Sequence, residues 1–273
     1  MPVPNTPAAW KDRLPWPDPD AHKHRRGRLA VVSGDAMHTG AARLAARAGL
    51  RIGAGVVRIL CPPDAAPVIA PVIEAVMLGL FHSPEGLAFE AREMDAVVIG
   101  PAAGVGDATA MNVRALAATG SALVIDADGL TSFERAPADL FGVLDRDDVL
   151  TPHTGEFGRL FPDLADRPRP EAARAAARRA GAIVVLKGRE TLIAAPDGRM
   201  AINGNGTPWL ATAGTGDVLA GMIAGLIAQR MDSFEAACAA VWMHAEAAQG
   251  FGPGLIAEDL PERLPSVLAG LRP

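Results

Sequence analysis

Short, uninterrupted apolar runs, separated by longer segments, constrain the fold of this chain more than any other feature. Residues 29–33 read LAVVS, and similar runs follow at residues 56–60, 96–99, 122–125 and 183–186. These runs are rich in Val and Ile and do not alternate with polar residues, which is typical of strands that are covered on both faces. The sequence therefore predicts a central, mostly parallel sheet.

Ala-rich segments of helical length separate several of these runs. They cover residues 40–50, 108–118 and 171–180. A strand followed by a helix, several times over, predicts right-handed crossovers with helices on both faces of the sheet. We therefore expect a three-layer α/β/α arrangement.

The last third of the chain has a different pattern. Two short runs at residues 191–195 and 199–203 flank Pro196-Asp197-Gly198, which predicts a hairpin. Residues 217–229 and 235–249 have helical spacing, and the second segment is Ala-rich almost all round, which predicts a buried helix.

The composition and the distribution of Pro and Gly limit the domain organisation, the binding partners and the cellular location that we expect. No low-complexity linker divides the chain, so we expect a Pro-rich lead over residues 1–28 and a single domain over residues 29–273. The 26 basic and 31 acidic residues give a net charge of −5, which argues against a nucleic-acid-binding surface.

The first residues lack a secretory pattern and no apolar stretch reaches membrane-spanning length, so we expect a cytoplasmic protein that does not bind membranes. Cys61 and Cys238 lie in apolar stretches, which predicts buried free thiols in a reducing compartment.

Small or hydrogen-bonding residues follow five predicted strands at the point where each strand ends. Four are the runs at residues 29–33, 96–99, 122–125 and 183–186, and the fifth is a short strand at residues 148–150. The residues that follow them are Gly34 and Asp35, Gly100 and Gly104, Asp126 and Asp128, His153 and Glu156, and Lys187 and Gly188. In open parallel sheets, ligands bind beyond the carboxyl ends of the strands. We therefore expect these residues to form one shared site.

The most specific segment is ATAGTGDVLAGMIAGLIAQ at residues 211–229. Gly214 and Gly216 allow the backbone to bend and to approach a ligand closely, and the apolar residues that follow have helical spacing. The turn of Gly214, Thr215 and Gly216 thus lies at a helix amino end, where free N–H groups and the helix dipole attract an anion. Asp217 has two open interpretations, a helix cap or a base beside a bound phosphate. The chain has no GxxxxGK[ST] loop, no GxGxxG after the first strand and no GxSxG motif.

Five segments together resemble ADP-dependent NAD(P)H-hydrate dehydratases of the ribokinase-like superfamily. In the order of that family, they are TGAARLAARAGLRIGAGVVRI, VVIGPAAGVG, LVIDADGL, LTPHTGEFGRL, and VVLKGRETLIAAPDG with ATAGTGDVLAG. The resemblance extends over residues 27–249, and the combination of TPHxGE, LKGxxT and GTGD is specific. It implies a ribokinase-like fold, ADP as co-substrate, a Mg²⁺ requirement with unknown ligands, and a homo-oligomer, often a tetramer. Because only residues 1–28 precede the first predicted strand, we expect no fused epimerase domain of the kind found in many relatives. The resemblance then implies a separate epimerase as a functional partner.

The resemblance also assigns roles to individual residues. It implies that the hydrated dinucleotide is held by Ala41, Gly104, His153 and Asp217. It implies that the adenine nucleotide is held by Lys187, Gly188, Arg189, Glu190, Thr191 and Gly216.

Three segments depart from the family pattern. The usual GPGLG loop contains Ala102 and Ala103 here, which stiffen it. The usual GGTGD begins with Ala213, and DADAL has Gly129 in place of its second Ala. None of these changes removes a group that the chemistry needs.

Several of these side chains have two interpretations. His153 either hydrogen-bonds its own loop or contacts the ligand, and the PHxGE context favours the ligand. Lys187 either pairs with a structural carboxylate or contacts the nucleotide, and its place at a strand end favours the nucleotide. Asp126 and Asp128 serve either the loop geometry or magnesium. Glu156 is expected to cap the helix that follows it.

The implied reaction is the ADP-dependent dehydration of (6S)-NADHX and NADPHX, the hydrated dinucleotides, to NADH and NADPH with release of AMP and phosphate. In this hypothesis Asp217 is the catalytic base, and the amides of the GTGD turn stabilise the transferring phosphoryl group. The main alternative is an ATP-dependent kinase of the same superfamily that phosphorylates a vitamin precursor, which would share Asp217. A nucleotide-binding regulator without catalysis is a third possibility, but the presence of Asp217 argues against it.

Overall fold

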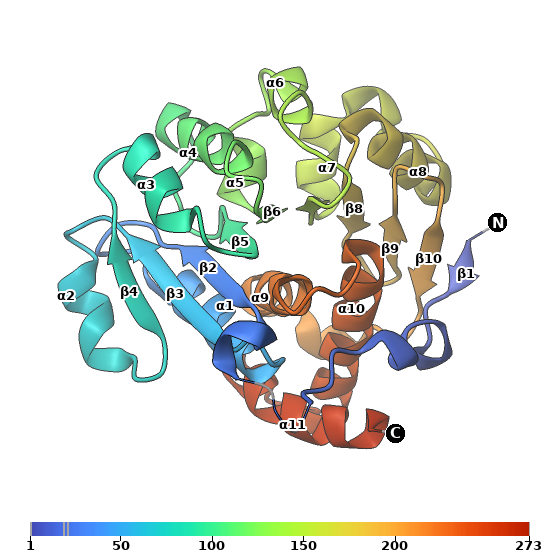
Figure 1. The fold of residues 1–273 in the computed structure, drawn as a ribbon. Coiled ribbons are helices and arrows are strands. Elements are labelled where there is room, and N and C mark those ends of the chain that lie inside the picture. The colour runs from blue at the N-terminus through green and yellow to red at the C-terminus, as the bar shows by residue number, and fades with distance from the viewer. Residues whose placement is uncertain (1, 19, 21, 273) are drawn as a thin grey trace.

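The computed structural model describes residues 2–18, 20 and 22–272. The described residues form one ten-stranded sheet in the order β1-β10-β9-β8-β7-β6-β5-β2-β3-β4 (Figure 1). The strands are β1 Val3–Pro4, β2 Arg28–Val32, β3 Val56–Cys61, β4 Met77–Leu80, β5 Ala96–Ile99, β6 Ala122–Ile125, β7 Val149–Leu150, β8 Ile183–Leu186, β9 Thr191–Ala194 and β10 Met200–Asn203. Every neighbouring pair is parallel except for β9, which runs antiparallel to both β8 and β10.

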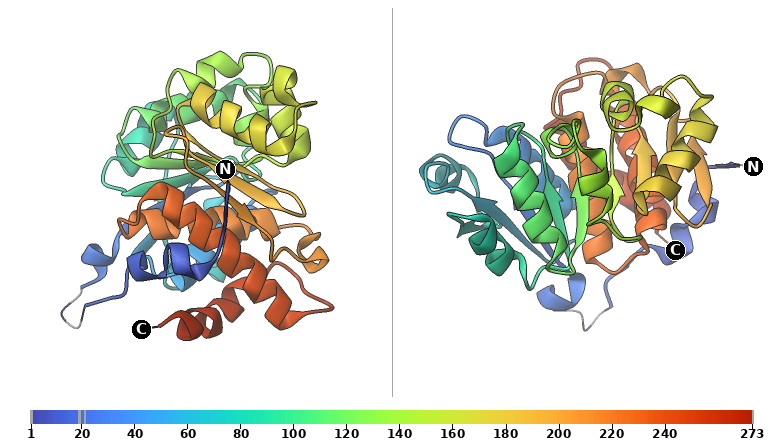
Figure 2. Two further views of the ribbon diagram at one scale, coloured as in Figure 1. Left: turned by 90° about the vertical axis from the view of Figure 1, so that its right-hand side faces the viewer. Right: turned by 90° about the horizontal axis from the view of Figure 1, so that it is seen from above.

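Helices cover both faces of the sheet. They are α1 Gly40–Arg51, α2 Ala66–Ile69, α3 Pro84–Ala91, α4 Asp107–Ala117, α5 Asp128–Thr131, α6 Pro137–Phe141, α7 Thr154–Leu160, α8 Arg169–Ala180, α9 Thr215–Ala228, α10 Ser233–Phe251 and α11 Asp259–Leu271. Helices α3 to α8 lie on one face, and α1, α9, α10 and α11 lie on the other (Figures 1 and 2). The three-layer α/β/α arrangement expected from the sequence is therefore confirmed.

The core consists of two apolar clusters, one on each face of the sheet. Successive residues of a strand point to opposite faces. In β6, Val124 belongs to the cluster under α1 and α9, whereas Leu123 and Ile125 belong to the cluster under α3 to α8. This double burial explains why the strands have continuous apolar sequences.

The elements expected from the sequence occur in the structure. The five apolar runs form β2, β3, β5, β6 and β8, and the hairpin is β9 and β10. Helix α10 is buried along nearly its whole length, as its Ala-rich sequence predicts. Strand β4 was not predicted from the sequence, because it lies at the sheet edge, contains Gly79 and exposes Met77 and Leu80.

Residues before β2 pack onto the rest of the molecule. Strand β1 pairs with β10 at the sheet edge, and the Trp10 side chain is only 1% exposed. The Asn5 side-chain amide donates to the Cys238 carbonyl oxygen at 2.8 Å and to Asn203 Oδ1 at 2.9 Å. The division of the chain at residue 28 stays a prediction.

Two further expectations concern the thiols and the membrane. Cys61 and Cys238 are free and buried, as predicted, and burial raises the pKa of each thiol. Within the described part of the chain, no helix has both the length and the apolar character that a membrane crossing requires.

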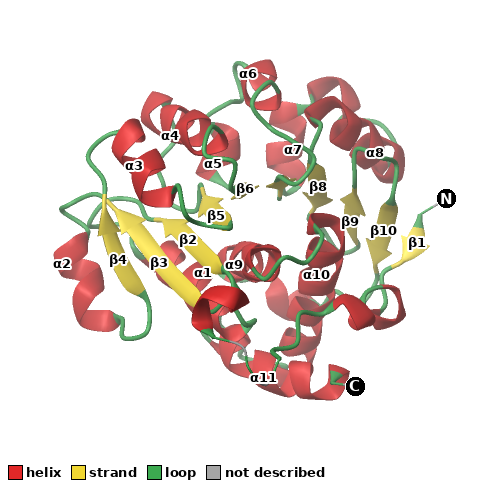
Figure 3. Cartoon of the chain, in the orientation of Figure 1, coloured by secondary structure: helices red, strands yellow, loops and turns green. Residues whose placement is uncertain are grey.

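A close helix contact fixes the position of α9. Gly221 of α9 lies against α1, and a Cβ atom built at this glycine would be 2.1 Å from the Ala45 carbonyl oxygen. One turn further along α9, a Cβ atom at Gly225 would be 2.5 Å from Ile52 Cγ2. Glycine at these positions lets α9 approach α1 and lie beneath the centre of the sheet (Figure 3).

We expect Gly221→Ala to destabilise the protein, because the new methyl group meets a backbone atom that cannot move away without moving α1. Overpacking of this kind costs about 1–3 kcal/mol or more in unfolding free energy, which urea denaturation would measure. Gly250→Ala in α10 is the matched control, since a Cβ atom there meets nothing within 4 Å. An equally stable Gly221→Ala protein would contradict this account of α9 placement.

Candidate active site

The five strands whose ends carry polar residues are consecutive neighbours in the sheet. Their order is β8-β7-β6-β5-β2, and all are parallel. Their carboxyl ends therefore lie along one edge, as the sequence predicts. The amino end of α9 reaches the same edge, because Gly216 lies near the side chains of Asp126 and Lys187.

In the described part of the chain, the amino end of α9 has backbone amides without a side-chain cap. Gly214 precedes the helix with a φ of 89°, and no side chain caps the helix there among the described residues. A Cβ atom at Gly214 would be 2.7 Å from Leu44 Cδ1 of α1, so glycine is required by both conformation and space. The Thr215 hydroxyl donates to the carbonyl oxygens of Leu210 and Thr212, at 2.9 and 3.1 Å, which holds the turn. Amide groups at such an end favour an anion.

Asp217 occupies the first turn of α9 in a partly buried position. Burial raises the pKa of Asp217 to about 6, and the nearby negative charges of Asp126 and Asp128 add to this rise. The positive charge of Lys187 opposes it. A carboxylate with a pKa near neutrality is better suited to accept a proton than an ordinary aspartate.

Asp126 and Lys187 form an ion pair beside the anion turn. Lys187 Nζ lies 2.7 Å from Asp126 Oδ1, and the Asp126 side chain is only 3% exposed. A Cβ atom at Gly216 would lie 3.5 Å from both Asp126 Oδ2 and Lys187 Nζ. Lys187 therefore pairs with a buried carboxylate, which was one of its two interpretations. Its ammonium group also lies next to the amino end of α9.

Asp128 holds the loop that follows β5. Its Oδ2 atom accepts a hydrogen bond from the Gly104 amide at 2.9 Å. Between the two aspartates, Ala127 has a φ of 48° and a ψ of −118°, a conformation that only glycine adopts readily. Ala102, in the altered GPAAG loop, has a φ of 54°. Backbone strain therefore accompanies both loops that bring Asp126, Asp128 and Gly104 together.

His153 and Glu156 cap α7 reciprocally. His153 Nδ1 accepts from the amides of Gly155 and Glu156, at 2.9 and 3.2 Å, and Glu156 Oε2 accepts from the His153 amide at 2.8 Å. The prediction that Glu156 caps this helix is confirmed. Because Nδ1 is an acceptor, a neutral His153 carries its proton on Nε2, and the side chain is 54% exposed. Ligand contact by His153 stays a prediction.

The segment of residues 187–191 is held by a residue that the sequence analysis missed. Arg169 Nη2, from the start of α8, donates to the carbonyl oxygens of Leu186 and Glu190 at 3.3 and 3.2 Å. Thr191 Oγ1 donates to the Gly188 carbonyl oxygen at 3.2 Å. Gly188, Arg189 and Glu190 are exposed along this segment. No motif marks Arg169, since its role depends on contacts with distant residues.

His244 is a second residue that the sequence analysis missed. It is 6% exposed within α10, and its Nε2 lies 2.9 Å from the Thr215 carbonyl oxygen. Burial lowers the pKa of His244 to about 4, so the neutral ring donates Nε2–H to this carbonyl. His244 thus holds the first turn of α9 in place by a hydrogen bond from α10.

Ala41 belongs to α1, the helix that packs against the start of α9. It is the second residue of α1, whose Leu44, one turn later, faces Gly214. The structure therefore gathers Gly104, Asp217, Gly216 and Lys187 around one edge, with Ala41 and His153 on neighbouring elements. Their individual roles stay predictions.

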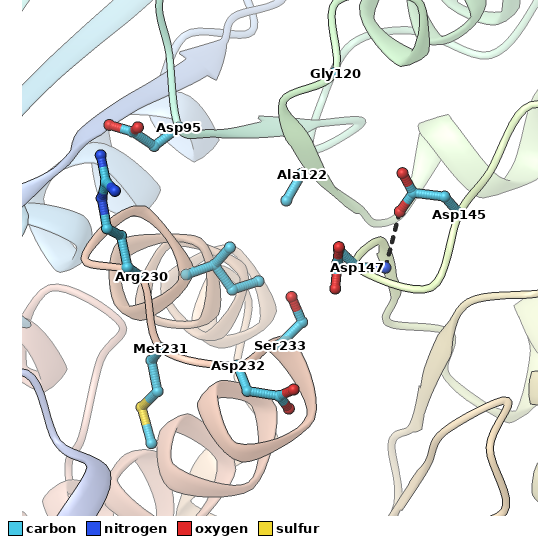
Figure 4. A pocket seen from close by; sticks show the side chains of 10 residues that line it. Asp95, Gly120, Ala122, Asp145, Asp147, Arg230, Met231, Asp232 and Ser233 are labelled. Atoms are coloured by element: carbon cyan, nitrogen blue, oxygen red, sulfur yellow. Dashed lines mark hydrogen bonds between the residues drawn. The ribbon is translucent and has the colours of Figure 1, made fainter.

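A pocket beyond the amino ends of the strands, opposite the candidate active site, contains none of these residues. Asp95, Asp145, Asp147 and Asp232 line it together with Arg230, near the amino ends of β5 and β6 (Figure 4). Among the described residues, no group of three or more His, Cys, Asp or Glu side chains is arranged to hold a metal ion, here or elsewhere.

Comparison with known proteins relates the chain to one family. Residues 29–265 match the NAD(P)H-hydrate dehydratase family. The ADP-dependent (S)-NAD(P)H-hydrate dehydratase of Xanthomonas campestris is 36% identical over 274 residues, covering 93% of this chain and 92% of that protein. The bifunctional NAD(P)H-hydrate repair enzyme Nnr of Methanopyrus kandleri is 38% identical over 265 residues, covering 92% of this chain. This chain spans about half the length of such bifunctional relatives, 51% in that case.

A solved structure has a similar fold over the full length of this chain. The ADP/ATP-dependent NAD(P)H-hydrate dehydratase of Bacillus subtilis, co-crystallised with ATP and Mg²⁺, matches with a TM-score of 0.85 and 27% identity, covering 100% of both chains. The ribokinase-like fold expected from the sequence is therefore confirmed.

Two substitutions should move the pKa of Asp217 in opposite directions. Asp126→Asn removes a negative charge and should lower the pKa of Asp217, whereas Lys187→Met removes a positive charge and should raise it. Carboxyl-selective NMR titration of the purified variants measures both shifts without substrate. Shifts of the same sign, or none, would contradict the proposed electrostatic coupling.

Proposed function

Because the chain belongs to the NAD(P)H-hydrate dehydratase family, we propose that it catalyses the ADP-dependent dehydration of (6S)-NADHX and NADPHX to NADH and NADPH. The products besides the dinucleotide are AMP and phosphate. The observation that carries this proposal is the placement of Asp217, with its raised pKa, at the uncapped amino end of α9 beside Lys187. A diphosphate bound at this end would lie next to a carboxylate that can activate an alcohol.

The first step transfers a phosphoryl group to the hydrate. The C6 hydroxyl of the hydrated nicotinamide attacks the β-phosphorus of ADP, and Asp217 accepts the hydroxyl proton. The bond from the β-phosphorus to the bridging oxygen breaks, and AMP leaves. The amides of the turn at Gly214, Thr215 and Gly216 stabilise the charge on the transferring group.

The second step expels phosphate. Hydroxide is a poor leaving group at neutral pH, whereas a phosphate ester leaves readily. The lone pair of the ring nitrogen drives out the phosphate, and loss of a ring proton restores the dihydronicotinamide.

The remaining residues bind and orient the two substrates. Gly104, Ala41 and His153 hold the hydrated dinucleotide, and the segment of residues 187–191 holds the adenine nucleotide. Arg169 and His244 act indirectly, since they fix that segment and the first turn of α9.

The donor set suits a magnesium ion that arrives with the nucleotide. Asp126 and Asp128 each use one oxygen within the protein, and Mg²⁺ in nucleotide sites is usually held by one or two carboxylates together with phosphates and waters. Asp126 and Asp128 would hold the ion, which would supply charge neutralisation of the diphosphate.

The proposal extends to the surroundings of the enzyme. We place it in the cytoplasm, as a homotetramer, with a separate NAD(P)HX epimerase supplying the S epimer. The two buried free thiols support a reducing compartment.

The alternative is a small-molecule kinase, and product analysis separates the two functions. Purified protein is incubated with enzymatically prepared NADHX, Mg²⁺ and either ADP or ATP, and the absorbance of NADH is followed together with free phosphate. We expect equal amounts of NADH and phosphate, with ADP as an effective donor. A stable phosphate ester without NADH would identify a kinase, and no turnover with either donor would refute the proposal.

Asp217→Asn should lower kcat by about 10²–10⁴-fold, the usual contribution of a positioned base, while hydrate binding remains largely intact. The same variant should be more stable than the wild type at pH 8. The folded protein raises the pKa of Asp217 and so destabilises its charged form, which the substitution removes. Kinetics and thermal unfolding measure the two effects, and a near-normal kcat would show that Asp217 is not the base.

The pH dependence of turnover should follow the same carboxylate. Asp217 must be deprotonated to act, so kcat should fall as the pH drops through about 6, the pKa raised by burial. A profile measured from pH 4.5 to 8.5 tests this, with thermal unfolding at each pH as the control. An acidic limb near 4, the ordinary range for aspartate, would contradict the assignment.

A further inference from the structure

The loop of residues 204–210 contacts two parts of the candidate active site. It follows β10 and leads to α9, where the Thr215 hydroxyl donates to the Leu210 carbonyl oxygen at 2.9 Å. At Gly206 the same loop approaches Arg189, because a Cβ atom built at this glycine would be 2.6 Å from the Arg189 carbonyl oxygen. The loop therefore touches both the start of α9 and the segment that is proposed to hold the adenine nucleotide.

Asn205 ties this loop to α10. Its Nδ2 atom donates to Glu246 Oε1 at 2.8 Å and to the Trp242 carbonyl oxygen at 3.2 Å. Asn203 Nδ2 donates to Asn205 Oδ1 at 2.6 Å, and Gln249 Nε2 donates to the Asn205 carbonyl oxygen. A displacement of the loop would break several of these hydrogen bonds.

The same network of side-chain amides continues into the first residues of the chain. Asn5 Nδ2 donates to Asn203 Oδ1 at 2.9 Å, and Trp10 Nε1 donates to Asn5 Oδ1 at 3.0 Å. Asn203 is 2% exposed and Asn5 is 6% exposed. Buried polar networks whose members are paired are rigid, so the loop is anchored in the interior of the molecule.

The segment opposite Gly206 has less freedom to avoid a new side chain than a surface loop usually has. Arg169 Nη2 donates to the carbonyl oxygens of Leu186 and Glu190, on either side of Arg189. A methyl group at position 206 would come closer to the Arg189 carbonyl oxygen than van der Waals contact allows. Because the loop is anchored to α10, the methyl group would displace Arg189 together with its neighbours.

We propose that Gly206 is a positioning residue for the nucleotide. The absence of a side chain at this position lets the loop, held by Asn205, lie against Arg189 and keep the segment of residues 187–191 in the arrangement that binds ADP. The inference rests on the proposed function, which assigns the adenine nucleotide to this segment. Gly206 acts on ADP through Arg189 and not by direct contact.

The substitution Gly206→Ala tests this role, and Gly204→Ala is the matched control. Both glycines are exposed, belong to the same loop and have a φ outside the left-handed region. A Cβ atom at Gly204 meets nothing within 4 Å. A second control, Ser121→Ala, removes a buried hydroxyl that donates to the Met94 carbonyl oxygen at 2.8 Å, which lowers stability away from the site.

Calorimetric titration with ADP in the presence of Mg²⁺ measures binding without turnover. Gly206→Ala is expected to weaken ADP binding about 2–10-fold, the range for the loss of one hydrogen bond, whereas Gly204→Ala and Ser121→Ala bind ADP as the wild type does. In steady-state kinetics, Gly206→Ala is expected to raise the KM for ADP and to leave the KM for NADHX nearly unchanged. A general loss of stability would not separate the two substrates in this way.

A double-mutant cycle with Asn205→Ala tests how the effect is transmitted. Once Asn205 no longer ties the loop to α10, the loop can move away from Arg189, so Gly206→Ala should weaken ADP binding less in this background than in the wild type. Independent effects of the two substitutions would show that Asn205 does not hold the loop against the segment.

Two results would overturn the proposal while the proposed function stands. They are unchanged ADP affinity in Gly206→Ala, and equal weakening in Gly206→Ala and Gly204→Ala. A wild type that binds ADP, with the expected difference between the two glycine variants, but does not dehydrate NADHX would refute the proposed function alone. A wild type that does not bind ADP would refute both.

Discussion

The contact between α9 and α1 is the constraint on which the rest of the site depends. At Gly221 the backbone of α9 approaches the Ala45 carbonyl oxygen so closely that no side chain fits between them. This approach places the amino end of α9 at the carboxyl edge of the sheet, where Gly214 turns the chain and leaves the first amides uncapped. The uncapped amino end of α9 and the carboxyl ends of five parallel strands thus lie together because α9 and α1 pack closely.

The electrostatics of the site follow from this placement. Asp217 is brought into a partly buried position beside Asp126, and both burial and that charge favour its protonated form. Lys187 pairs with Asp126 at 2.7 Å, so the pair places a positive group near the amino end of α9 at little net charge. In the proposed function, this arrangement gives a base with a pKa close to neutrality beside an uncapped helix end that would bind phosphate. The raised pKa of Asp217 also lowers the stability of the folded state when the carboxyl group is charged.

The sequence predicted the fold better than it predicted the contacts within the site. Continuous Val and Ile runs such as residues 96–99 identify buried strands because both faces of the sheet are covered, whereas the edge strand β4 lacks that signal. Residues at strand ends could be grouped because parallel strands present their carboxyl ends together. The partners of Lys187 and His244 could not be predicted, since Asp126 and Thr215 are far away in the chain and no local pattern encodes the pairing. The cap formed by His153 is local, but histidine is not a usual capping residue.

The central claim is that the hydroxyl group of the hydrate attacks the diphosphate, and an isotope label tests it most directly. NADHX prepared with ¹⁸O in the C6 hydroxyl is converted with unlabelled ADP, and the released phosphate is analysed by mass spectrometry. The account predicts that each phosphate carries one ¹⁸O atom, because the carbon–oxygen bond breaks only after the oxygen has been phosphorylated. Recovery of the label in water, with unlabelled phosphate, would contradict it.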